Sequence, residues 1–180
     1  MGRLTRTALA AATTLLAAAL AACTGGAAAP GDATKFYTAG LRPTAPDFGG
    51  SLLDGGSFQL ATERGHVVVV NFWGSWCAPC RAEAADLESV ATASKPQGVV
   101  FVGVNMRDTK DQSDSYVTAH RITYPSIFDP GGRVALQFES VPAGAIPATL
   151  VIDASGGIAA IHLGPVTRDD LTEMIAKAAA

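Results

Sequence analysis

Two cysteines separated by two residues stand at the junction between an apolar run and a helical pattern, and this junction constrains the fold most. The run, residues 67–72, holds β-branched and aromatic side chains with one polar member, Asn71. Such a run predicts a strand buried on both faces, and therefore a central one. Apolar residues at helical spacing over 80–93 predict a helix. Cys77 and Cys80 are thus expected between a buried strand and the first turn of a helix.

The other patterns alternate between strands and helices, which is typical of an α/β layered domain. Apolar runs predict strands at 99–104, 148–152 and 157–163, and helical patterns cover 111–120 and 168–179. The strands at 67–72 and 99–104 are expected to be parallel, joined by a right-handed crossover. Ahead of them, residues 46–48 and 57–60 flank the turn residues 54–56, which predicts a small hairpin.

The N-terminus has the pattern of an export signal. Two arginines within residues 1–6 precede an uncharged run of Ala, Leu and Thr over 8–22, which is shorter than the about 20 residues of a transmembrane helix. Leu20-Ala21-Ala22-Cys23 resembles a bacterial lipobox, which would make Cys23 the lipidated first residue of the exported chain. An ordinary cleavage site that happens to lie near a cysteine is the alternative. We therefore expect a signal peptide at 1–22, a lipidated flexible tether at 23–45, and one domain at 46–180 on the outer face of the cell membrane.

Composition and charge narrow the chemistry. The chain has three cysteines, an odd number that leaves Cys77 and Cys80 as a pair once Cys23 is lipidated. A net charge of −3 argues against nucleic acid as a partner. The three histidines, His66, His120 and His162, show no spacing typical of ligands, so no metal is expected. A purely structural disulfide stays open, although so short a loop would add little stability.

The spacing of the cysteines gives each a role in thiol-disulfide exchange. Unpaired N–H groups at the start of a helix favour a thiolate at Cys77, which is expected to attack the partner. Cys80, one turn later, is expected to resolve the mixed disulfide. Pro79 suits the first helical turn, because no intrahelical donor is needed there.

Residues 67–81, VVVVNFWGSWCAPCR, resemble the active-site strand and helix of thioredoxin-fold proteins, specifically the exported TlpA/ResA-like thiol-disulfide oxidoreductases. The resemblance extends over nearly all of 46–180 and implies a thioredoxin fold with an N-terminal β-hairpin and a central insertion within 107–144. It also implies that the Ile146-Pro147 bond is cis and faces the cysteines, with the backbone of Ile146 pairing with the client. A proline that merely starts a strand is the alternative for Pro147.

The same resemblance singles out Glu83 and Trp76. Thioredoxin has a buried aspartate where this chain has Asn71, whereas the ResA-like subgroup has a glutamate at the position of Glu83. On a helix this residue shares a face with Cys80, and its carboxylate can oppose ionisation of that thiol or take its proton. A solvated glutamate paired with Arg81 or another surface charge is the alternative. Trp76 resembles the family tryptophan at the docking surface, and Trp73 is expected to be packing.

The function that these features favour is that of an enzyme: a membrane-tethered thiol-disulfide oxidoreductase acting on proteins with C-x-x-C pairs or disulfides. Glu83 and the anchor favour a reductant of apocytochrome c cysteines in cytochrome c biogenesis. A membrane thiol-reducing protein would supply its electrons. No nicotinamide or flavin motif is present, so no cofactor is expected.

Other functions stay open at this point. An oxidant that donates its disulfide to exported proteins is the nearest, because direction depends on small differences in thiolate stabilisation. Peroxide reduction is disfavoured because Gly74 stands where a peroxidatic pattern has threonine. A copper-binding module is disfavoured, because related modules use C-x-x-x-C plus a histidine and the spacing in this chain is shorter. An adhesion or solute-binding lipoprotein is the remaining alternative, and it would require that Cys77→Ser leave the biological phenotype unchanged.

Overall fold

The computed structural model describes residues 34–142 and 144–180, and the predicted signal peptide and lipidated Cys23 lie outside them. Within these residues, six strands form one mixed sheet in the order β1-β8-β7-β4-β5-β6, and β2 and β3 form a separate hairpin. The strands are β1 Thr34–Phe36, β2 Gly49–Ser51, β3 Ser57–Gln59, β4 Val68–Trp73, β5 Val100–Met106, β6 Ser126–Asp129, β7 Ala148–Ile152 and β8 Ile158–Leu163. The helices are α1 Ala78–Ser94, α2 Lys110–His120 and α3 Arg168–Ala179, with 3₁₀ turns η1 Leu60–Glu63, η2 Lys95–Gln97 and η3 Ala135–Gln137.

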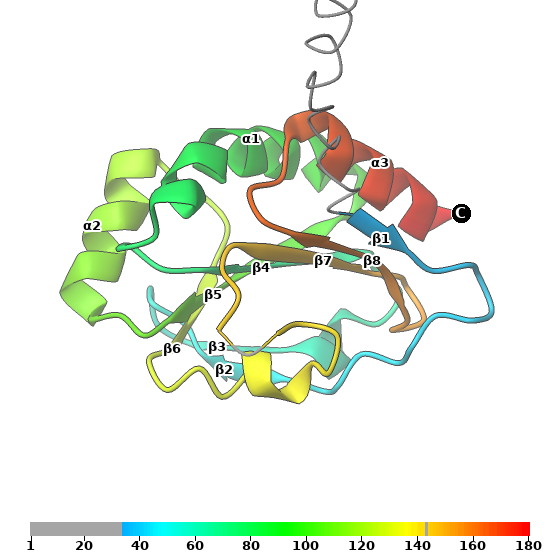
Figure 1. The fold of residues 1–180 in the computed structure, drawn as a ribbon, viewed down its shortest axis with the longest axis horizontal. Helices are drawn as coiled ribbons and strands as arrows, with labels where there is room; N and C mark the ends of the chain where they lie inside the picture. The colour runs from blue at the N-terminus through cyan, green and yellow to red at the C-terminus, as the bar shows by residue number, and fades with distance from the viewer. Residues whose placement is uncertain (1–33, 143) are drawn as a thin grey trace, which may run out of the picture. The chain divides into compact units, whose positions relative to one another are not determined.

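The sheet is covered on both faces (Figure 1): α1 and α3 lie over one face, and the hairpin and η3 lie over the other. Strand β4 alternates between the two cores. Val68, Val70 and Phe72 pack into the cluster on the hairpin side, whereas Val69 packs with Leu87 under the helices. This burial on both faces confirms the predicted central strand, and the arrangement is the predicted thioredoxin fold.

The strand pairings follow the sequence expectations closely. Strand β4 is parallel to β5 and antiparallel to β7, and β7 is antiparallel to β8. The hairpin is present, although its first arm is β2 at 49–51 rather than 46–48. The central insertion contains α2 and the edge strand β6. The sequence predicted the helix but not β6, because the four residues of β6 have no distinct pattern.

The predicted boundary of the tether at residue 45 is wrong. Strand β1 pairs with β8, and the guanidinium of Arg42 forms an ion pair with Asp153 at 2.9 Å. Arg42 also donates to the carbonyl oxygens of Lys177 and Ala178 at the end of α3. The folded domain therefore includes residues 34–45. Their composition hides this, because a strand of only three residues is too short to show an apolar pattern of its own.

Asp153 gives this attachment a pH dependence. Burial would raise the pKa of its carboxyl, but hydrogen bonds from Ser155, Arg42 and Gly157 outweigh it and lower the pKa from 3.8 to about 2. The resulting stability is present above pH 4 and is lost as the pH falls toward 2. We expect Asp153→Asn to lower the free energy of unfolding by about 1 to 2 kcal/mol at pH 7 and by much less at pH 2. Denaturant titrations at both pH values measure the difference.

The matched control for this prediction is Asp54→Asn, which changes an exposed carboxylate in the turn between β2 and β3. It should leave the free energy of unfolding within about 0.5 kcal/mol of the wild type at both pH values. Equal losses for the two variants would show that net charge, rather than the Arg42 contact, sets the stability.

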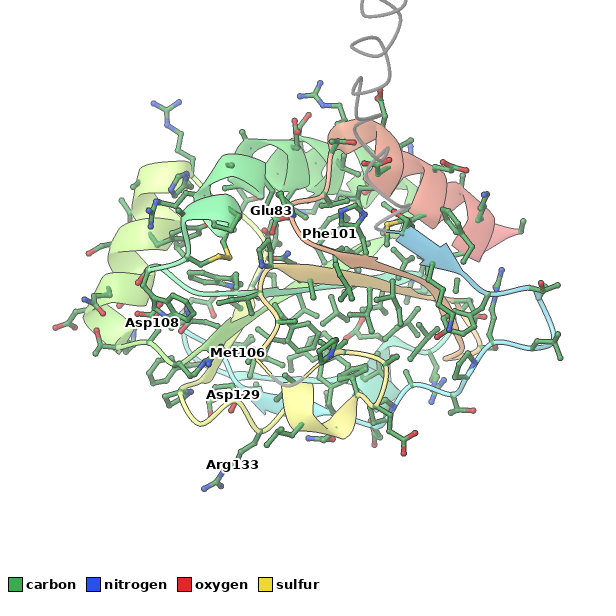
Figure 2. All side chains as sticks on the ribbon, in the orientation of Figure 1. Glu83, Phe101, Met106, Asp108, Asp129 and Arg133 are labelled. Atoms are coloured by element: carbon green, nitrogen blue, oxygen red, sulfur yellow. A yellow bond between two sulfur atoms is a disulfide. The ribbon has the colours of Figure 1, made fainter. Side chains whose placement is uncertain are left out.

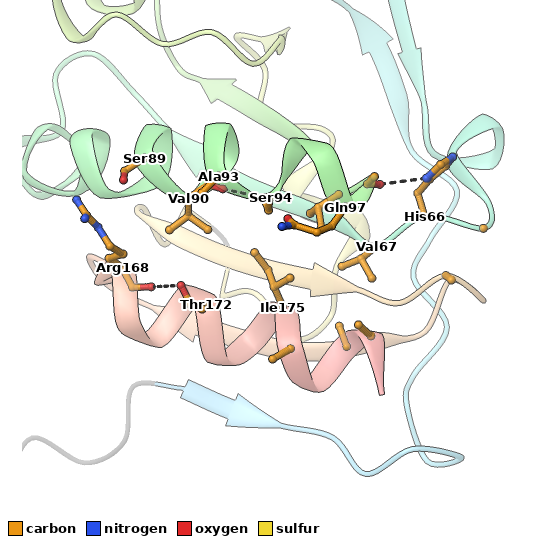
Figure 3. A pocket seen from close by; sticks show the side chains of 17 residues that line it. His66, Val67, Ser89, Val90, Ala93, Ser94, Gln97, Arg168, Thr172 and Ile175 are labelled. Atoms are coloured by element: carbon orange, nitrogen blue, oxygen red, sulfur yellow. Dashed lines mark hydrogen bonds between the residues drawn. The ribbon is translucent and has the colours of Figure 1, made fainter.

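A groove of about 730 Å³ lies between α1 and α3 (Figure 3), with apolar side chains such as Val90 and Ile175 among its lining residues. It lies along the C-terminal half of α1, so it is separate from the cysteines, which are at the other end of that helix. No helix in 34–142 or 144–180 is both long and apolar enough to span a bilayer.

Candidate functional site

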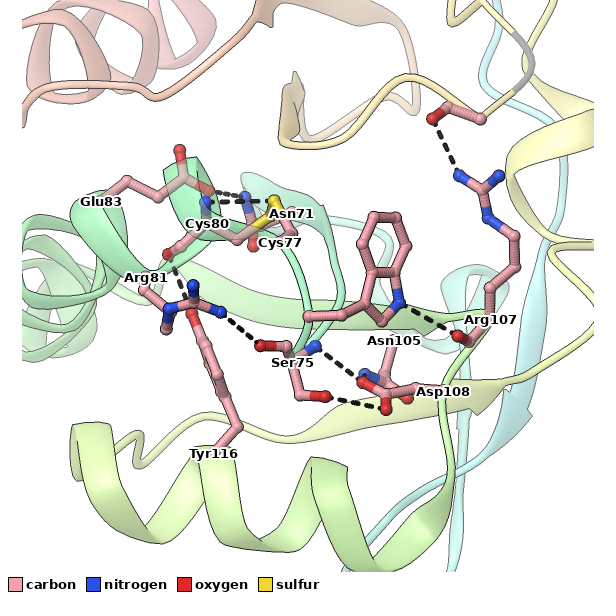
Figure 4. The surroundings of a disulfide bond; sticks show 12 residues. Asn71, Ser75, Cys77, Cys80, Arg81, Glu83, Asn105, Arg107, Asp108 and Tyr116 are labelled. Atoms are coloured by element: carbon pink, nitrogen blue, oxygen red, sulfur yellow. Dashed lines mark hydrogen bonds between the residues drawn. A yellow bond between two sulfur atoms is a disulfide. The ribbon is translucent and has the colours of Figure 1, made fainter.

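The two cysteines lie where α1 begins. Cys77 is the N-cap residue of α1, Pro79 lies in its first turn, and Cys77 and Cys80 form a disulfide (Figure 4). The backbone N–H of Cys80 donates to Cys77 Sγ at 3.1 Å, which places a donor where a thiolate at Cys77 would need one. Cys77 is 4% exposed and Cys80 is 0% exposed. Cys77, which is expected to attack, is therefore the slightly more exposed residue of the two.

Glu83 is buried beneath α1, one turn after Cys80, and is 2% exposed. Asn71 Nδ2 donates to its Oε1 at 2.8 Å, and the N–H of Val166 donates to its Oε2 at 2.9 Å. Figure 2 shows the side chain between α1 and the sheet. The alternative of a solvated glutamate paired with Arg81 or another surface charge is wrong, because Glu83 is buried and the Arg81 guanidinium donates to the carbonyl oxygen of Ser75.

The surroundings of Glu83 raise the pKa of its carboxyl into the neutral range. Burial raises the pKa of its carboxyl, the donors Val166 and Asn71 lower it, and the balance raises it from 4.5 to about 7. Asn71 therefore has a use that the sequence did not indicate: its Nδ2 also donates to Thr149 Oγ1 at 3.0 Å, and the two bonds hold it against Glu83. A carboxyl with this pKa can accept and release protons at neutral pH.

The two tryptophans near the cysteines differ as predicted in burial. Trp73 is 3% exposed, stacks on Tyr116 with ring centroids 4.4 Å apart, and donates from Nε1 to Ser126 Oγ. Trp76 is 50% exposed, and its Nε1 donates to the carbonyl oxygen of Arg107 at 3.0 Å. Trp76 therefore presents a fixed apolar surface next to Cys77.

Gly74 leaves the space that the Trp76 ring occupies. A Cβ atom at position 74 would lie 2.8 Å from Trp76 Nε1 and 3.3 Å from the carbonyl oxygen of Met106. We expect Gly74→Ala to displace the Trp76 ring, break its bond to Arg107 and slow exchange with protein clients by about tenfold. The rate with dithiothreitol, which needs no docking surface, should change much less. Tryptophan fluorescence and exchange kinetics measure both effects, and equal slowing with both substrates would contradict the prediction.

The Ile146-Pro147 peptide bond is cis and lies beside the cysteines. Ile146 packs against the cluster that contains Cys77 and Cys80, and Pro147 is buried. Within the part of the chain that the structure describes, the backbone of Ile146 forms no hydrogen bond. Its N–H and C=O are thus available for pairing with an extended segment.

The sequence did not reveal a polar network that braces the turn before Cys77. Asp108 accepts from the N–H and hydroxyl of Ser75, from Asn105 Nδ2 and from the N–H of Thr109. Burial would raise the pKa of Asp108, but the donors Asn105, Ser75 and Thr109 outweigh it and hold the pKa below its usual range. Its place between the end of a strand and a helix cap was the available signal.

A second unforeseen contact comes from α2. The hydroxyl of Tyr116 donates to the carbonyl oxygen of Cys80 at 2.9 Å, which fixes the first turn of α1 from the side. The three histidines do not contact the cysteines: His66 is exposed, the His120 ring lies tilted against that of Tyr116, and His162 is buried and hydrogen-bonds to Thr34. Among the described residues, no three His, Cys, Asp or Glu side chains are grouped as metal ligands would be.

Comparison with known proteins agrees with this geometry. The model of the AhpC/TSA family matches residues 41–161. The chain is 31% identical over 142 residues to the thiol-disulfide oxidoreductase ResA of Geobacillus kaustophilus, covering 77% of this chain and 80% of that protein. It is 36% identical over 112 residues to the thiol:disulfide interchange protein HelX of Rhodobacter capsulatus, covering 62% and 60%.

Solved structures are similar over most of the chain. A secreted thiol-disulfide isomerase from Corynebacterium glutamicum has a TM-score of 0.76 at 36% identity, covering 81% of this chain and 91% of that one. A DsbF homologue from Corynebacterium diphtheriae has a TM-score of 0.76 at 38% identity, covering 82% and 94%. Together with the C-x-x-C disulfide at the start of α1, these matches show that the chain belongs to the AhpC/TSA family and is a thioredoxin-fold thiol-disulfide oxidoreductase similar to ResA.

Proposed function

We propose that this protein is a membrane-tethered reductant of client disulfides outside the cytoplasm, with the cysteines of apocytochrome c as its first client. The observation that carries the proposal is Glu83, a buried carboxyl with a pKa of about 7, one helical turn from Cys80. Such a group can take the proton from a resolving cysteine, or return it, at neutral pH. The resemblance to ResA supports apocytochrome c as the client, and the lipobox at Cys23 supports the tether.

In the proposed reaction, the thiolate of Cys77 attacks one sulfur of the client disulfide. A bond forms between Cys77 and that sulfur, and the other client cysteine leaves as a thiolate that takes a proton from water. Glu83 then takes the proton of the Cys80 thiol, and the Cys80 thiolate attacks Cys77 Sγ. The client leaves with both cysteines reduced, and Cys77 and Cys80 are oxidised to the disulfide.

Docking of the client uses the two surfaces beside Cys77. The exposed ring of Trp76 lies on one side, and the unbonded backbone of Ile146 next to Pro147 lies on the other. An extended client segment that pairs with Ile146 would bring its cysteine over Cys77. A membrane thiol-reducing protein would return electrons to the disulfide through the same surface.

A disulfide-donating oxidant is the second candidate. The observation that favours it is the similarity, at 36% and 38% identity, to structures described as a thiol-disulfide isomerase and a DsbF homologue. The two candidates share the site and differ only in the reduction potential of the Cys77/Cys80 pair.

The deciding experiment equilibrates the full-length protein with dithiothreitol and glutathione buffers and measures the midpoint potential of the pair. A value near or below about −270 mV, as in thioredoxin, supports the reductant, and oxidised apocytochrome c is then the first client to assay. A value near about −120 mV, as in a dedicated oxidant, overturns it in favour of disulfide donation. Mass spectrometry of the mature N-terminus tests the tether, because an unmodified Cys23 would contradict it.

A further inference from the structure

Arg107 connects the two sides of the client surface. Its carbonyl oxygen accepts from Trp76 Nε1, its Cζ lies 5.3 Å from the centre of the Trp76 ring, and its Nη2 donates to the carbonyl oxygen of Gly144 at 2.9 Å. Gly144 lies two residues before Ile146. The backbone of Arg107 has φ +51°, which residues other than glycine adopt rarely. These contacts thus hold the strained backbone of Arg107 between Trp76 and Gly144.

The guanidinium of Arg107 keeps most of its donors for a ligand. An arginine has five N–H groups, and the contact with Gly144 uses one of them. Within the described ranges, Arg107 forms no ion pair with a carboxylate. Asp108, the next residue in the chain, keeps its negative charge, but its oxygens already accept from Ser75, Asn105 and Thr109 and form no ion pair with Arg107.

Arg81 adds a second positive charge close to the cysteines. Figure 4 shows Arg81 just below Cys80, and Arg107 farther away, to the right of both cysteines. Arg81 lines a groove together with Asp111, and its guanidinium donates to the carbonyl oxygen of Ser75. The guanidinium of Arg107 instead lies against the Trp76 ring and donates to Gly144, at the client surface, so the proposal depends on Arg107.

We propose that Arg107 selects client segments that carry Asp or Glu next to the reactive cysteine. The inference rests on the proposed exchange with protein clients and adds a substrate class to it. A carboxylate can accept two parallel hydrogen bonds from a guanidinium, so Arg107 would both orient and attract such a segment. The chain carries a net charge of −3, so this local positive surface is not a consequence of overall charge.

The test uses short peptides with one C-x-x-C pair and Glu, Gln or Lys on both sides of the first cysteine. The rate constant for exchange is measured with the full-length protein in both directions: reduced protein with peptide disulfide, and oxidised protein with peptide dithiol. We expect the Glu peptide to react about threefold to tenfold faster than the Gln peptide, and the Lys peptide to react more slowly. In 1 M salt, where charges are screened within about 3 Å, the Glu to Gln ratio should fall toward one.

Two substitutions and a control identify the residue responsible. Arg107→Gln should bring the Glu to Gln ratio to about one, and Arg107→Lys should keep part of the preference, because it keeps the charge but not the planar fork. Arg133→Gln removes the same charge from an exposed side chain that Figure 2 places far from the disulfide. The control should keep the wild-type ratio.

The outcomes separate this inference from the proposed function. Equal rates for the Glu and Gln peptides would overturn the role of Arg107 while leaving exchange with clients intact. Equal loss of preference in Arg107→Gln and Arg133→Gln would also overturn it, because net charge would then explain the preference. No exchange with any peptide in either direction would overturn both.

Discussion

Replacing Cys80 with serine is expected to stop turnover and to leave client proteins covalently attached through Cys77. Cys77 can still attack a client disulfide, but no thiolate remains to resolve the mixed disulfide. We expect multiple turnover to fall by at least about a hundredfold, since a nucleophile held in place acts at an effective concentration far above that of free thiols. Non-reducing electrophoresis detects the adducts, which dithiothreitol should release.

Cys77→Ser is the matched control. It leaves Cys80 as the remaining thiol of the pair, and Cys80 is 0% exposed, so a client sulfur cannot reach it. The control variant should lose activity to a similar extent but form no adduct. If Cys77→Ser traps clients and Cys80→Ser does not, the roles of the two sulfurs are reversed.

Mass spectrometry of the trapped adducts also identifies the clients. The fragment linked to Cys77 gives the residues on both sides of the client cysteine. Acidic residues at those positions would agree with the role proposed for Arg107, and C-x-x-C-H fragments would agree with apocytochrome c as client.

Glu83→Gln is expected to make the protein more stable at alkaline pH and less active at neutral pH. The pKa of Glu83 is raised from 4.5 to about 7, so the native state binds its proton more tightly than the unfolded state does. The stability that comes from this proton is therefore fully present below pH 4.5, and it is lost as the pH rises from 4.5 through 7. At pH 8 the oxidised variant should exceed the wild type by on the order of 2 kcal/mol, and its stability should lose this dependence on pH.

Glutamine keeps the length and shape of the glutamate side chain, and the N–H of Val166 can still donate to the glutamine oxygen. The glutamine nitrogen then faces Asn71 Nδ2, which is also a donor. This mismatch offsets part of the gain in stability that comes from removing the buried charge. Urea titrations of the oxidised protein from pH 4 to pH 8 measure it.

The same substitution removes the proposed proton acceptor for Cys80. We expect client reduction to slow by about a hundredfold at pH 7 and its pH profile to lose the inflection near 7. Glu139→Gln, at an exposed position after η3, is the matched control and should change neither stability nor rate. A Glu83→Gln variant with the wild-type rate and pH profile would show that Glu83 has no part in catalysis.

Several parts of the fold follow from local sequence alone. The run at 67–72 predicts the central strand because its side chains are apolar on both faces, and the structure has β4 at Val68–Trp73. The expected ends of α3 and β7 agree with the observed ones, since a Thr cap opens the helix and Pro147 precedes the strand. The cysteine pair at a strand–helix junction likewise fixes where the chemistry lies.

Other parts depend on contacts between residues far apart in the chain. Strand β1 exists because the edge of β8 offers backbone partners, and its three residues show no pattern of their own. Glu83 could be predicted as a candidate, but its raised pKa comes from burial under the packed fold, and its two hydrogen-bond donors are Val166, which is 83 residues away, and Asn71 on β4. Neither contact can be inferred from the spacing along α1.

The sequence by itself determined where the cysteine pair lies and which strand precedes it, because these depend on neighbours within about two helical turns. The family resemblance likewise follows from the residue pattern along 46–180. The tertiary structure decided the protonation of Glu83, the inclusion of residues 34–45 in the domain and the place of Arg107 between Trp76 and Gly144. The physical reason is that desolvation and long-range hydrogen bonds depend on what packs around a group, and packing is a property of the whole fold.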